Sequence, residues 1–466
     1  NFLKAKSFGD ILIVSVTSDR FVNKGPNQPF FSLNERIKAL SHIESIDHII
    51  ESNSPDAIEI IKSIKPDIYC KGKDYQNSKE DLTGKIKKEL DLVKSNNGKI
   101  VFTDEISFSS SRILNANNLL LNEKQTQFIN EIKKIYNFDH IKKSINNFKK
   151  LKVLIIGELI IDKYVFCDAV GKSGKDPMLV FSHVKTDEYL GGAGAVANHI
   201  SDFSENITLL SLIGDKNDRF KFITQQLSKK IKTKFFKKEL SPTIIKTRSV
   251  DNNSKHKMLG VYDINSEPLS INTSIKVENF IKKNIKKFDI VLAYDYGHGF
   301  FNDKIAKLIS LNSKYLALNA QVNSSSIGGH SIQKYKKSDF LIINESELRH
   351  EVRDNISTVE ELVKKLEKKL LFKECVVTRG MKGSLMYSKK HNKFNYCPAF
   401  ASNVIDKIGA GDSFLPFYSL SSILKNDSNL SLFLGSIAAA QSVESIGNSY
   451  NINKSKMLKS ISHIIK

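Results

Sequence analysis

Short apolar runs separated by helical patterns organise the first 118 residues. The run at 11–16 is almost wholly apolar, as expected of a parallel strand that is covered on both faces. A helical pattern follows at 33–44, and a second one at 57–64 is ended by Pro66. Further strands are predicted at 46–50, 67–70 and 99–102. This alternation predicts an α/β domain built on a doubly wound parallel sheet.

The same alternation restarts after a polar helical stretch. Residues 119–150 are rich in Lys, contain no Gly or Pro and carry a helical pattern, so we expect a connector there. A new strand is predicted at 152–157, and strands and helices alternate from there to residue 466 without a solenoid-type repeat. We therefore predict two α/β domains, 1–118 and 151–466, joined by a helical connector at 119–150.

Composition narrows the classes of function. No apolar stretch approaches the roughly 20 residues of a membrane-spanning helix, so no membrane partner is expected. The net charge of +21 rests on lysines scattered over helical faces, which indicates a solvated surface suited to anionic substrates rather than a nucleic-acid site. The four cysteines form no C-x-x-C pair, which favours free thiols in a reducing cytoplasm over zinc or disulfide bonds. Because the chain opens on Asn1 inside a patterned segment, we expect its true beginning to be missing.

The strongest pattern for chemistry is D-K-I-G-A-G-D at 406–412, which precedes an apolar helical run at 414–424. Gly409 and Gly411 let the backbone turn tightly and approach a ligand closely. The free N–H groups at the start of the helix would then face a phosphate, helped by the helix dipole. Asp412 could take a proton from an attacking hydroxyl group, and a kinase needs both features. Taken alone, the segment also fits a glycine turn with Asp412 as a helix N-cap.

Three further segments contain glycine-rich or polar turns. A second glycine-rich helix start lies at 190–199, and a strand runs into a glycine turn at 376–383. The segment N-E-S-E at 344–347 could orient a magnesium ion through water. Each segment alone also fits an ordinary turn or helix cap. No Walker A pattern occurs in the chain, which excludes a P-loop enzyme.

In this order, the segments resemble the ribokinase/PfkB carbohydrate kinases over about 153–466. The resemblance implies an αβα sandwich with a small β lid, ATP as cosubstrate and Mg²⁺ as cofactor. It also implies that Asp412 is the catalytic base and that Gly409, Ala410 and Gly411 form an anion hole. The resemblance further implies that Asn344 and Glu347 hold magnesium through water and contribute to ATP binding, together with Thr378, Gly380 and Gly383. On the sugar side it implies Asp162, Gly191 and Gly192.

Two segments resemble the kinase part of the bifunctional ADP-heptose synthases. P-T-I-I-K-T-R at 242–248 implies that Lys246 and Arg248 hold a phosphate already on the sugar, since paired cations suit a dianion. A surface strand with solvated charges fits the same residues. Y-D-Y-G-H-G at 294–299 resembles their D-Y-G-K-G and implies that Asp295 contacts the substrate. The departures from their pattern are Ala195 for Asn, N-A-Q at 319–321 for D-P-K, and Lys407 for Thr, and they leave the sugar open.

The first domain is similar to the cytidylyltransferase-like nucleotidyltransferases. Nucleotidyl transfer needs cations on the triphosphate and donors for the leaving pyrophosphate. Residues 1–10 resemble the helix that follows that family's H-x-G-H motif, and the motif itself is absent, so we expect the domain to be inactive or impaired as it stands. Solvated surface charges and a serine-rich helix cap fit the same residues. The candidate residues are Lys24, Arg36, Lys71, Asp74, Ser109, Ser110 and Ser111.

These resemblances imply a bifunctional enzyme of activated-sugar synthesis. The kinase would phosphorylate the anomeric hydroxyl of a sugar phosphate, a heptose 7-phosphate by resemblance, and the first domain would couple the resulting sugar 1-phosphate to a nucleotide. A separate phosphatase between the two steps, pairing of two kinase protomers and a cytoplasmic location are implied in the same way. The order of the two domains is reversed relative to the familiar fusion. Two alternatives stay open: a monofunctional kinase whose first domain only binds nucleotide or partners, and a Lys-rich nucleic-acid-binding protein.

Overall fold

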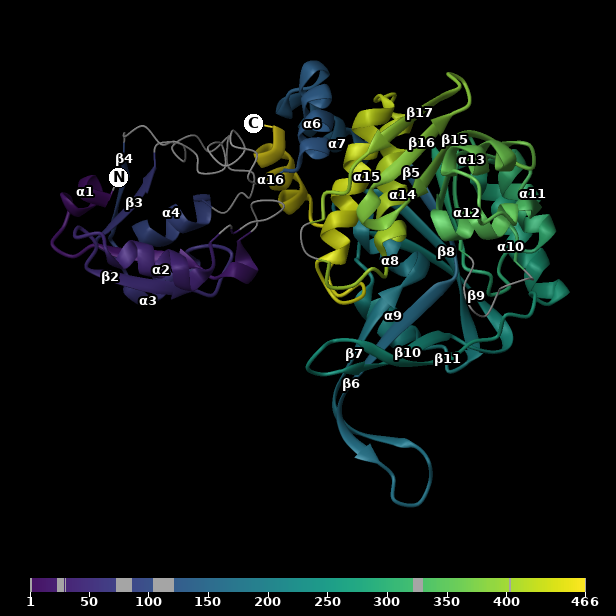
Figure 1. Cartoon of the computed structure of the whole chain (residues 1–466), viewed down its shortest axis with the longest axis horizontal. Coiled ribbons are helices and arrows are strands. Elements are labelled where there is room, and N and C mark those ends of the chain that lie inside the picture. The colour runs from purple at the N-terminus through teal and green to yellow at the C-terminus, as the bar shows by residue number, and fades with distance from the viewer. Residues whose placement is uncertain are drawn as a thin grey trace. The chain divides into compact units, whose positions relative to one another are not determined.

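The computed structural model describes residues 2–22, 29, 31–72, 86–103, 121–321, 330–401 and 404–465 (Figure 1). The chain divides into two compact units. One comprises residues 130–453, and the other comprises residues 1–129 together with 454–466. Among the described residues, no helix combines the length and the apolar character that crossing a bilayer requires.

Parallel strand pairs and flanking helices form the first unit. Strand β1 pairs in parallel with β2, and β3 pairs in parallel with β4. The predicted alternation of strands and helices is confirmed here, and α3 ends two residues before Pro66, whose ring cannot continue a helix. The described elements of this unit are α1 (Phe2–Lys6), β1 (Ile13–Thr17), α2 (Leu33–Ser41), β2 (His48–Ser52), α3 (Ile58–Ile64), β3 (Ile68–Gly72), α4 (Ile86–Ser95), β4 (Lys99–Thr103) and α16 (Lys454–Ile465).

Two helices occupy the stretch that was predicted to be a helical connector. Helix α6 spans Glu123–Ile135, and α7 spans Phe138–Asn147. The side chain of Asn137 accepts a hydrogen bond from the amide of His140, which caps α7 at its start. Residues 123–135 and 138–147 are therefore helical, while the connector role and the domain limits at 118 and 151 stay predictions.

A large sheet forms the centre of the second unit. Its strand order is β17-β16-β15-β14-β13-β12-β5-β8-β9. The pairs from β15 to β9 are parallel, whereas β16 and β17 are added in antiparallel fashion. The strands are β5 (Lys152–Gly157), β8 (Asn206–Lys216), β9 (Ile231–Pro242), β12 (Ile290–Asp295), β13 (Leu316–Ala320), β14 (Lys337–Asn344), β15 (Leu371–Thr378), β16 (Ser384–Ser388) and β17 (Lys393–Cys397).

Helices cover both faces of this sheet, as Figure 1 shows. All six residues of β12 are buried, because alternate side chains point into a packed layer on each side. Val291 and Ala293 pack in one core with side chains of α10, α11, α12 and α13, whereas Tyr294 reaches α14 on the other side. The predicted αβα sandwich is thus confirmed. The helices are α8 (Gly192–Ile200), α9 (Phe220–Gln226), α10 (Ile271–Asn284), α11 (Asp303–Asn312), α12 (Glu345–Val352), α13 (Val359–Glu367), α14 (Ala410–Ile423) and α15 (Ser428–Val443).

A second, four-stranded sheet forms the lid, in the order β11-β10-β6-β7. Its strands are β6 (Leu159–Lys172), β7 (Leu179–Gly191), β10 (Ile244–Asp251) and β11 (Lys257–Asp263). The register of β6 and β10 sets Asp162 opposite Lys246 and Tyr164 opposite Arg248. Because side chains alternate along a strand, these four residues share one face of the lid.

Candidate functional site

Asp412 lies in the first turn of α14. Its side chain is buried, and its Oδ1 atom accepts hydrogen bonds from the Tyr296 hydroxyl at 2.9 Å and from Gln321 Nε2 at 3.1 Å. The Tyr294 hydroxyl binds the backbone carbonyl of the same residue at 3.0 Å. The carboxyl group is therefore held at both its backbone and its side chain.

Burial raises the pKa of Asp412 to about 6. The hydrogen bond from Tyr296 opposes this shift, the charge of Asp162 adds to it, and the charge of Lys246 opposes it. A carboxyl group with this pKa is mostly ionised at neutral pH and is a stronger base than an exposed aspartate. The position and pKa of Asp412 thus suit general-base chemistry.

The turn that precedes α14 has the geometry of an anion hole. Gly409 adopts φ of 86° in the left-handed region and caps the helix, and the first helical hydrogen bond runs from the Ser413 amide to the Gly409 carbonyl. The amides of Ala410, Gly411 and Asp412 precede that bond, so they have no acceptor within the helix. A Cβ on Gly411 would meet no atom of the described residues within 4 Å, so these residues leave open space beside the amides. The structure therefore supplies the amide donors and the open space that binding a phosphate requires.

Asp406 holds this turn in place. Its Oδ1 atom accepts a hydrogen bond from the Ile408 amide at 3.1 Å and pairs with Lys257 of β11 at 2.5 Å. Its Oδ2 atom accepts hydrogen bonds from the Gly447 amide and from the Tyr164 hydroxyl of β6. One buried carboxylate thus connects two lid strands to the start of the glycine turn. The motif contains Asp406, but sequence reasoning assigned it no role.

Asp162 faces Asp412 from the lid. Its Oδ1 atom forms an ion pair with Arg248 at 2.5 Å, and both side chains are largely buried. A Cβ on Gly191 would overlap Asp162 Oδ2, so only glycine fits at position 191 with the carboxylate in this place. Lys246 lies on the same face of the lid, and burial lowers the pKa of its ammonium while the charge of Asp162 opposes the shift. The structure therefore brings the predicted sugar-side residues together.

The pairing of Arg248 bears on the predicted phosphate contact. Lys246 and Arg248 were expected to hold a phosphate as two cations. Arg248 is paired with Asp162, whereas Lys246 forms no ion pair among the described residues, so Lys246 is the cation of the two without a carboxylate partner of its own. The role of either residue in phosphate binding stays a prediction.

We expect Gly191→Ala to weaken sugar binding. The new methyl group would displace the Asp162 carboxylate, and a shift of this size at a substrate-orienting group lowers kcat/KM by about 10- to 100-fold. Steady-state kinetics with the sugar substrate varied would measure it. Gly194→Ala is the matched control, because its Cβ would meet Leu159 at an ordinary contact distance of 3.4 Å. Equal losses in the two variants would contradict the expected clash.

The predicted ATP-side residues meet at the ends of two adjacent strands. Asn344 and Thr378 are register partners at the ends of β14 and β15. Asn344 and Glu347 form a capping box at the start of α12: the Asn344 side chain accepts from the Glu347 amide at 2.8 Å, and Glu347 Oε2 accepts from the Asn344 amide at 3.0 Å. These hydrogen bonds match the alternative of a helix cap and place Glu347 at the strand ends. A role in holding magnesium stays a prediction.

Glycine is required at two positions of this site. Gly383 closes the turn after β15 with φ of 83°, and a Cβ there would overlap the Cys397 carbonyl. Gly192 begins α8 with φ of 54°, and a Cβ there would lie 2.5 Å from the Glu158 carbonyl. Gly380 also has positive φ, at 56°. Side chains would distort both turns, so the glycine patterns in the sequence mark real backbone requirements.

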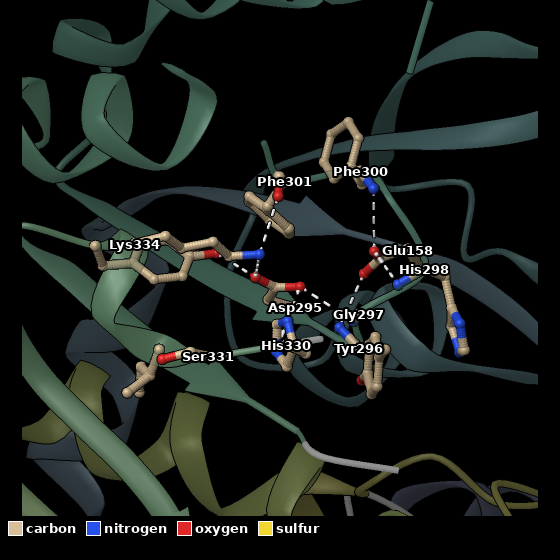
Figure 2. Close-up of polar contacts among 12 residues, drawn as sticks. Glu158, Asp295, Tyr296, Gly297, His298, Phe300, Phe301, His330, Ser331 and Lys334 are labelled. Carbon is tan, nitrogen blue, oxygen red and sulfur yellow. Dashed lines mark hydrogen bonds and ion pairs between the residues drawn. The ribbon is translucent and has the colours of Figure 1, made fainter. Parts of the chain in front are cut away.

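Asp295 lies in a buried polar cluster at the end of β12, shown in Figure 2. Its Oδ2 atom accepts a hydrogen bond from the Tyr335 hydroxyl at 2.7 Å and pairs with Lys334 at 2.7 Å. Its Oδ1 atom accepts from the Gly297 amide at 3.1 Å. Both oxygens are thus held by the protein, and contact of Asp295 with a substrate stays a prediction.

Glu158 forms a second buried carboxylate in the same cluster (Figure 2). Its Oε2 atom accepts a hydrogen bond from the Tyr296 amide at 3.0 Å, and its Oε1 atom accepts from the amides of His298 at 3.1 Å and Phe300 at 3.3 Å. Burial, followed by the charge of Asp295, raises the pKa of Glu158 to about 7. The carboxylate fixes the backbone of the segment that carries Tyr296.

In the first unit, two of the predicted cations have partners within the protein. Arg36 pairs with Asp19 at 2.5 Å and donates to the Thr17 carbonyl at 2.9 Å. Lys71 pairs at 2.9 Å with Glu89, which is buried. The other candidates, Lys24, Asp74, Ser109, Ser110 and Ser111, lie outside the described residues. The proposed roles of this set stay predictions.

Sequence reasoning assigned no role to Tyr296, Gln321 or Glu158. Tyr296 and Gln321 lie 116 and 91 positions from Asp412 along the chain, so no local pattern connects them. Both fall inside segments noted above, the D-Y-G-H-G string and the departure N-A-Q. A polar residue at the carboxyl end of a predicted central strand is the signal that could have found them, because ligands bind at that edge of open α/β sheets.

Two family models match the chain. Residues 150–455 match the model described as pfkB family carbohydrate kinase. Residues 2–116 match the model described as cytidylyltransferase-like. The two matches follow one another along the chain in the order that the sequence motifs predicted.

Curated relatives share the name bifunctional protein HldE. The one from Campylobacter jejuni (strain RM1221) is 28% identical over 321 residues, which cover 67% of this chain and 66% of that protein. The one from Aliarcobacter butzleri (strain RM4018) is 27% identical over 317 residues, which cover 64% of this chain and 62% of that protein. The matches therefore span slightly less than two thirds of the length of these relatives.

Solved structures of sugar kinases share the fold of the larger unit. Ribokinase from Giardia lamblia aligns with a TM-score of 0.53 at 16% identity, over 67% of this chain and 98% of that one. Phosphofructokinase-2 from Escherichia coli, in complex with fructose-6-phosphate, aligns with a TM-score of 0.52 at 13% identity, over 67% of this chain and 99% of that one. At these identities the likeness shows the fold alone.

Proposed function

The chain belongs to the pfkB family of carbohydrate kinases, and from this premise we propose that the unit at 130–453 transfers the γ-phosphoryl group of ATP to a hydroxyl group of a sugar phosphate. The observation that carries the proposal is the environment of Asp412. A buried carboxylate with a pKa of about 6 lies directly beside helix-start amides that have no acceptor within the helix. A base and an anion site in one turn are what phosphoryl transfer to an alcohol requires.

In the proposed mechanism, Asp412 takes the proton of the acceptor hydroxyl as its oxygen attacks phosphorus. The amides of Ala410, Gly411 and Asp412 stabilise the charge on the transferred group. Asp162 binds sugar hydroxyls from the lid, and Lys246 provides positive charge toward an anionic substrate. The lid sheet excludes water from the reacting groups, which limits wasteful transfer to solvent.

Magnesium would be held near Asn344 and Glu347. The donors there are amide and carboxylate oxygens, which is the ligand chemistry that this cation prefers. The capping box commits one oxygen of each side chain to a backbone amide, so the site suits an ion bound through water rather than directly. When bound, magnesium would neutralise charge on the ATP phosphates.

We propose a heptose 7-phosphate as the substrate and the anomeric hydroxyl as the acceptor. The support is the similarity to the HldE proteins and the K-T-R segment of β10. The first unit would then couple a sugar 1-phosphate to a nucleotide with loss of pyrophosphate. Because the kinase product carries two phosphates and the second step uses one, a phosphatase has to act between them.

A kinase assay against hexose and heptose phosphates tests the substrate. We expect ATP consumption with a heptose 7-phosphate at least about 100-fold faster, by kcat/KM, than with the sugar lacking the phosphate, since a site built for an anion rejects the neutral analogue. Mass spectrometry of the product locates the new phosphate. Equal rates with and without the 7-phosphate would contradict a phosphorylated substrate, and no ATP consumption with any sugar would contradict the kinase itself.

A second function for the first unit is favoured by two ion pairs. Arg36 and Lys71, the described cations expected at a triphosphate, are paired with Asp19 and Glu89. A domain that binds nucleotide or a partner without transferring a nucleotidyl group fits these pairs. Incubation of full-length protein with a sugar 1-phosphate and each nucleoside triphosphate separates the two functions, because pyrophosphate release supports transfer and its absence beside a working kinase supports the binding role.

A further inference from the structure

The two oxygens of the Asp412 carboxylate have different surroundings. Both side-chain donors, the Tyr296 hydroxyl at 2.9 Å and Gln321 Nε2 at 3.1 Å, bind Oδ1. Within the described part of the chain, no hydrogen bond reaches Oδ2. A carboxylate oxygen with two donors is stabilised and has few lone-pair directions left, whereas its neighbour keeps its full capacity to accept.

Both donors are placed by the end of β12. Glu158 binds the amides of Tyr296, His298 and Phe300, so the backbone beside Tyr296 is fixed at three points (Figure 2). The Tyr296 ring also stacks on Tyr294, with 6.4 Å between ring centroids and 17° between planes.

Gln321 is tied to the same strand end. Gln321 lies directly after β13, and its backbone N–H donates to the backbone carbonyl of Asp295 at 2.8 Å. The side chain that reaches Asp412 therefore starts from a fixed backbone position, as Tyr296 does.

We propose that Tyr296 and Gln321 are positioning residues that hold Oδ1 of Asp412 and reserve Oδ2 for the acceptor hydroxyl, with Glu158 keeping Tyr296 in place. This inference rests on the proposed kinase function. In the reaction, the proton of the acceptor hydroxyl moves to Oδ2. The acceptor oxygen forms a bond to the γ-phosphorus while the bond from that phosphorus to the bridging oxygen breaks, and ADP leaves with the bonding electrons.

The two donors also set the strength of the base. Among the described residues, the charged groups that act on the pKa of Asp412 are Asp162 on β6 and Lys246 on β10, and the titratable hydroxyls beside it are those of Tyr294 and Tyr296. The hydrogen bonds from Tyr296 and Gln321 stabilise the ionised carboxylate against burial and the charge of Asp162. Removal of either donor should therefore make Asp412 harder to ionise.

Tyr296→Phe tests this inference through the pH profile. The acid limb of the pH profile of kcat/KM reports the pKa of the catalytic base in the free enzyme. We expect the limb to move up by about one pH unit, so that activity falls about fivefold near pH 6 and much less near pH 8.5, because loss of one donor to a charged group has this order of effect. A role in folding alone would lower activity equally at both pH values.

Tyr294→Phe is the matched control. It removes a buried tyrosine hydroxyl from the same strand end and the same ring stack, but that hydroxyl binds the backbone carbonyl of Asp412 and not the carboxylate. We expect the acid limb of this variant to stay where it is in the wild type, whatever happens to its turnover. An equal shift in both tyrosine variants would overturn the inference.

Gln321→Met provides a second test that does not depend on a tyrosine. Methionine keeps the length of the side chain and lacks the donor, so the same upward movement of the acid limb is expected. Glu158→Gln alone should also move the acid limb upward. The same substitution added to Tyr296→Phe should cause no further movement, because the effect of Glu158 passes through Tyr296. If neither Tyr296→Phe nor Gln321→Met moves the limb of an active kinase, the inference is wrong. A wild-type protein without kinase activity would instead contradict the proposed function.

Discussion

Asp412→Asn should lower the kcat of phosphoryl transfer by about three orders of magnitude and leave the fold intact. Asparagine has nearly the same shape and can still accept hydrogen bonds from Tyr296 and Gln321 through its carbonyl oxygen. It cannot take a proton, and general-base catalysis contributes about 10²- to 10⁴-fold. Steady-state kinetics at saturating ATP and sugar phosphate measure the loss.

The pH dependence of the residual activity gives an independent check. In the wild type the base is ionised above its pKa of about 6, so activity should fall as the pH is lowered through that value. The asparagine variant should lose this limb. Thermal unfolding and ATP binding serve as controls for the fold. Turnover near the wild-type value, or an unchanged acid limb, would contradict Asp412 as the base.

Gly409→Ala should damage both stability and catalysis. Its φ of 86° is unfavourable for a residue with a side chain, and the new Cβ would lie 2.5 Å from Asn448 Oδ1. Strain of this kind costs about 1–3 kcal/mol of unfolding free energy. Relief of the strain would turn the following amides away from the phosphate, and loss of one such donor lowers kcat by about 10²- to 10³-fold. Denaturant unfolding and steady-state kinetics measure the two effects.

Gly411→Ala distinguishes the effect of backbone strain from the effect of an added methyl group in the same turn. Gly411 lies two residues further on, has no positive φ, and a Cβ there would meet nothing within 4 Å in the part of the chain that the structure describes. We expect its unfolding free energy to stay within about 0.5 kcal/mol of the wild type. Its added methyl group would occupy the open space beside the amides, so the KM for ATP should rise. If Gly409→Ala and Gly411→Ala were equally stable, the left-handed turn would not be the source of the requirement for glycine.

The sequence alone determined the layered α/β fold, because the pattern of apolar residues within each element predicts which of its faces are buried. The apolar run at 152–157 favours a strand covered on both faces, and β5 is that strand, with five of its six residues buried. The same holds for the turn that starts α14. Gly409, Gly411 and Asp412 are adjacent in the chain, and the backbone needs of that turn depend on near neighbours. The glycine turn and its carboxylate could therefore be located together, and their roles as anion hole and base stay predictions.

Only the tertiary structure decided which charges pair and which oxygen of the Asp412 carboxylate is held. Arg248 pairs with Asp162, and Lys71 pairs with Glu89, through contacts between elements that no local pattern encodes. Cations that were predicted from the sequence to bind phosphates therefore already have partners within the protein. Tyr296 and Gln321 reach Asp412 because β12 and β13 are neighbours in the sheet and end at the same edge. Side-chain contacts of this kind depend on strand order and register, which long-range packing sets, and hydrophobic periodicity carries no information about them.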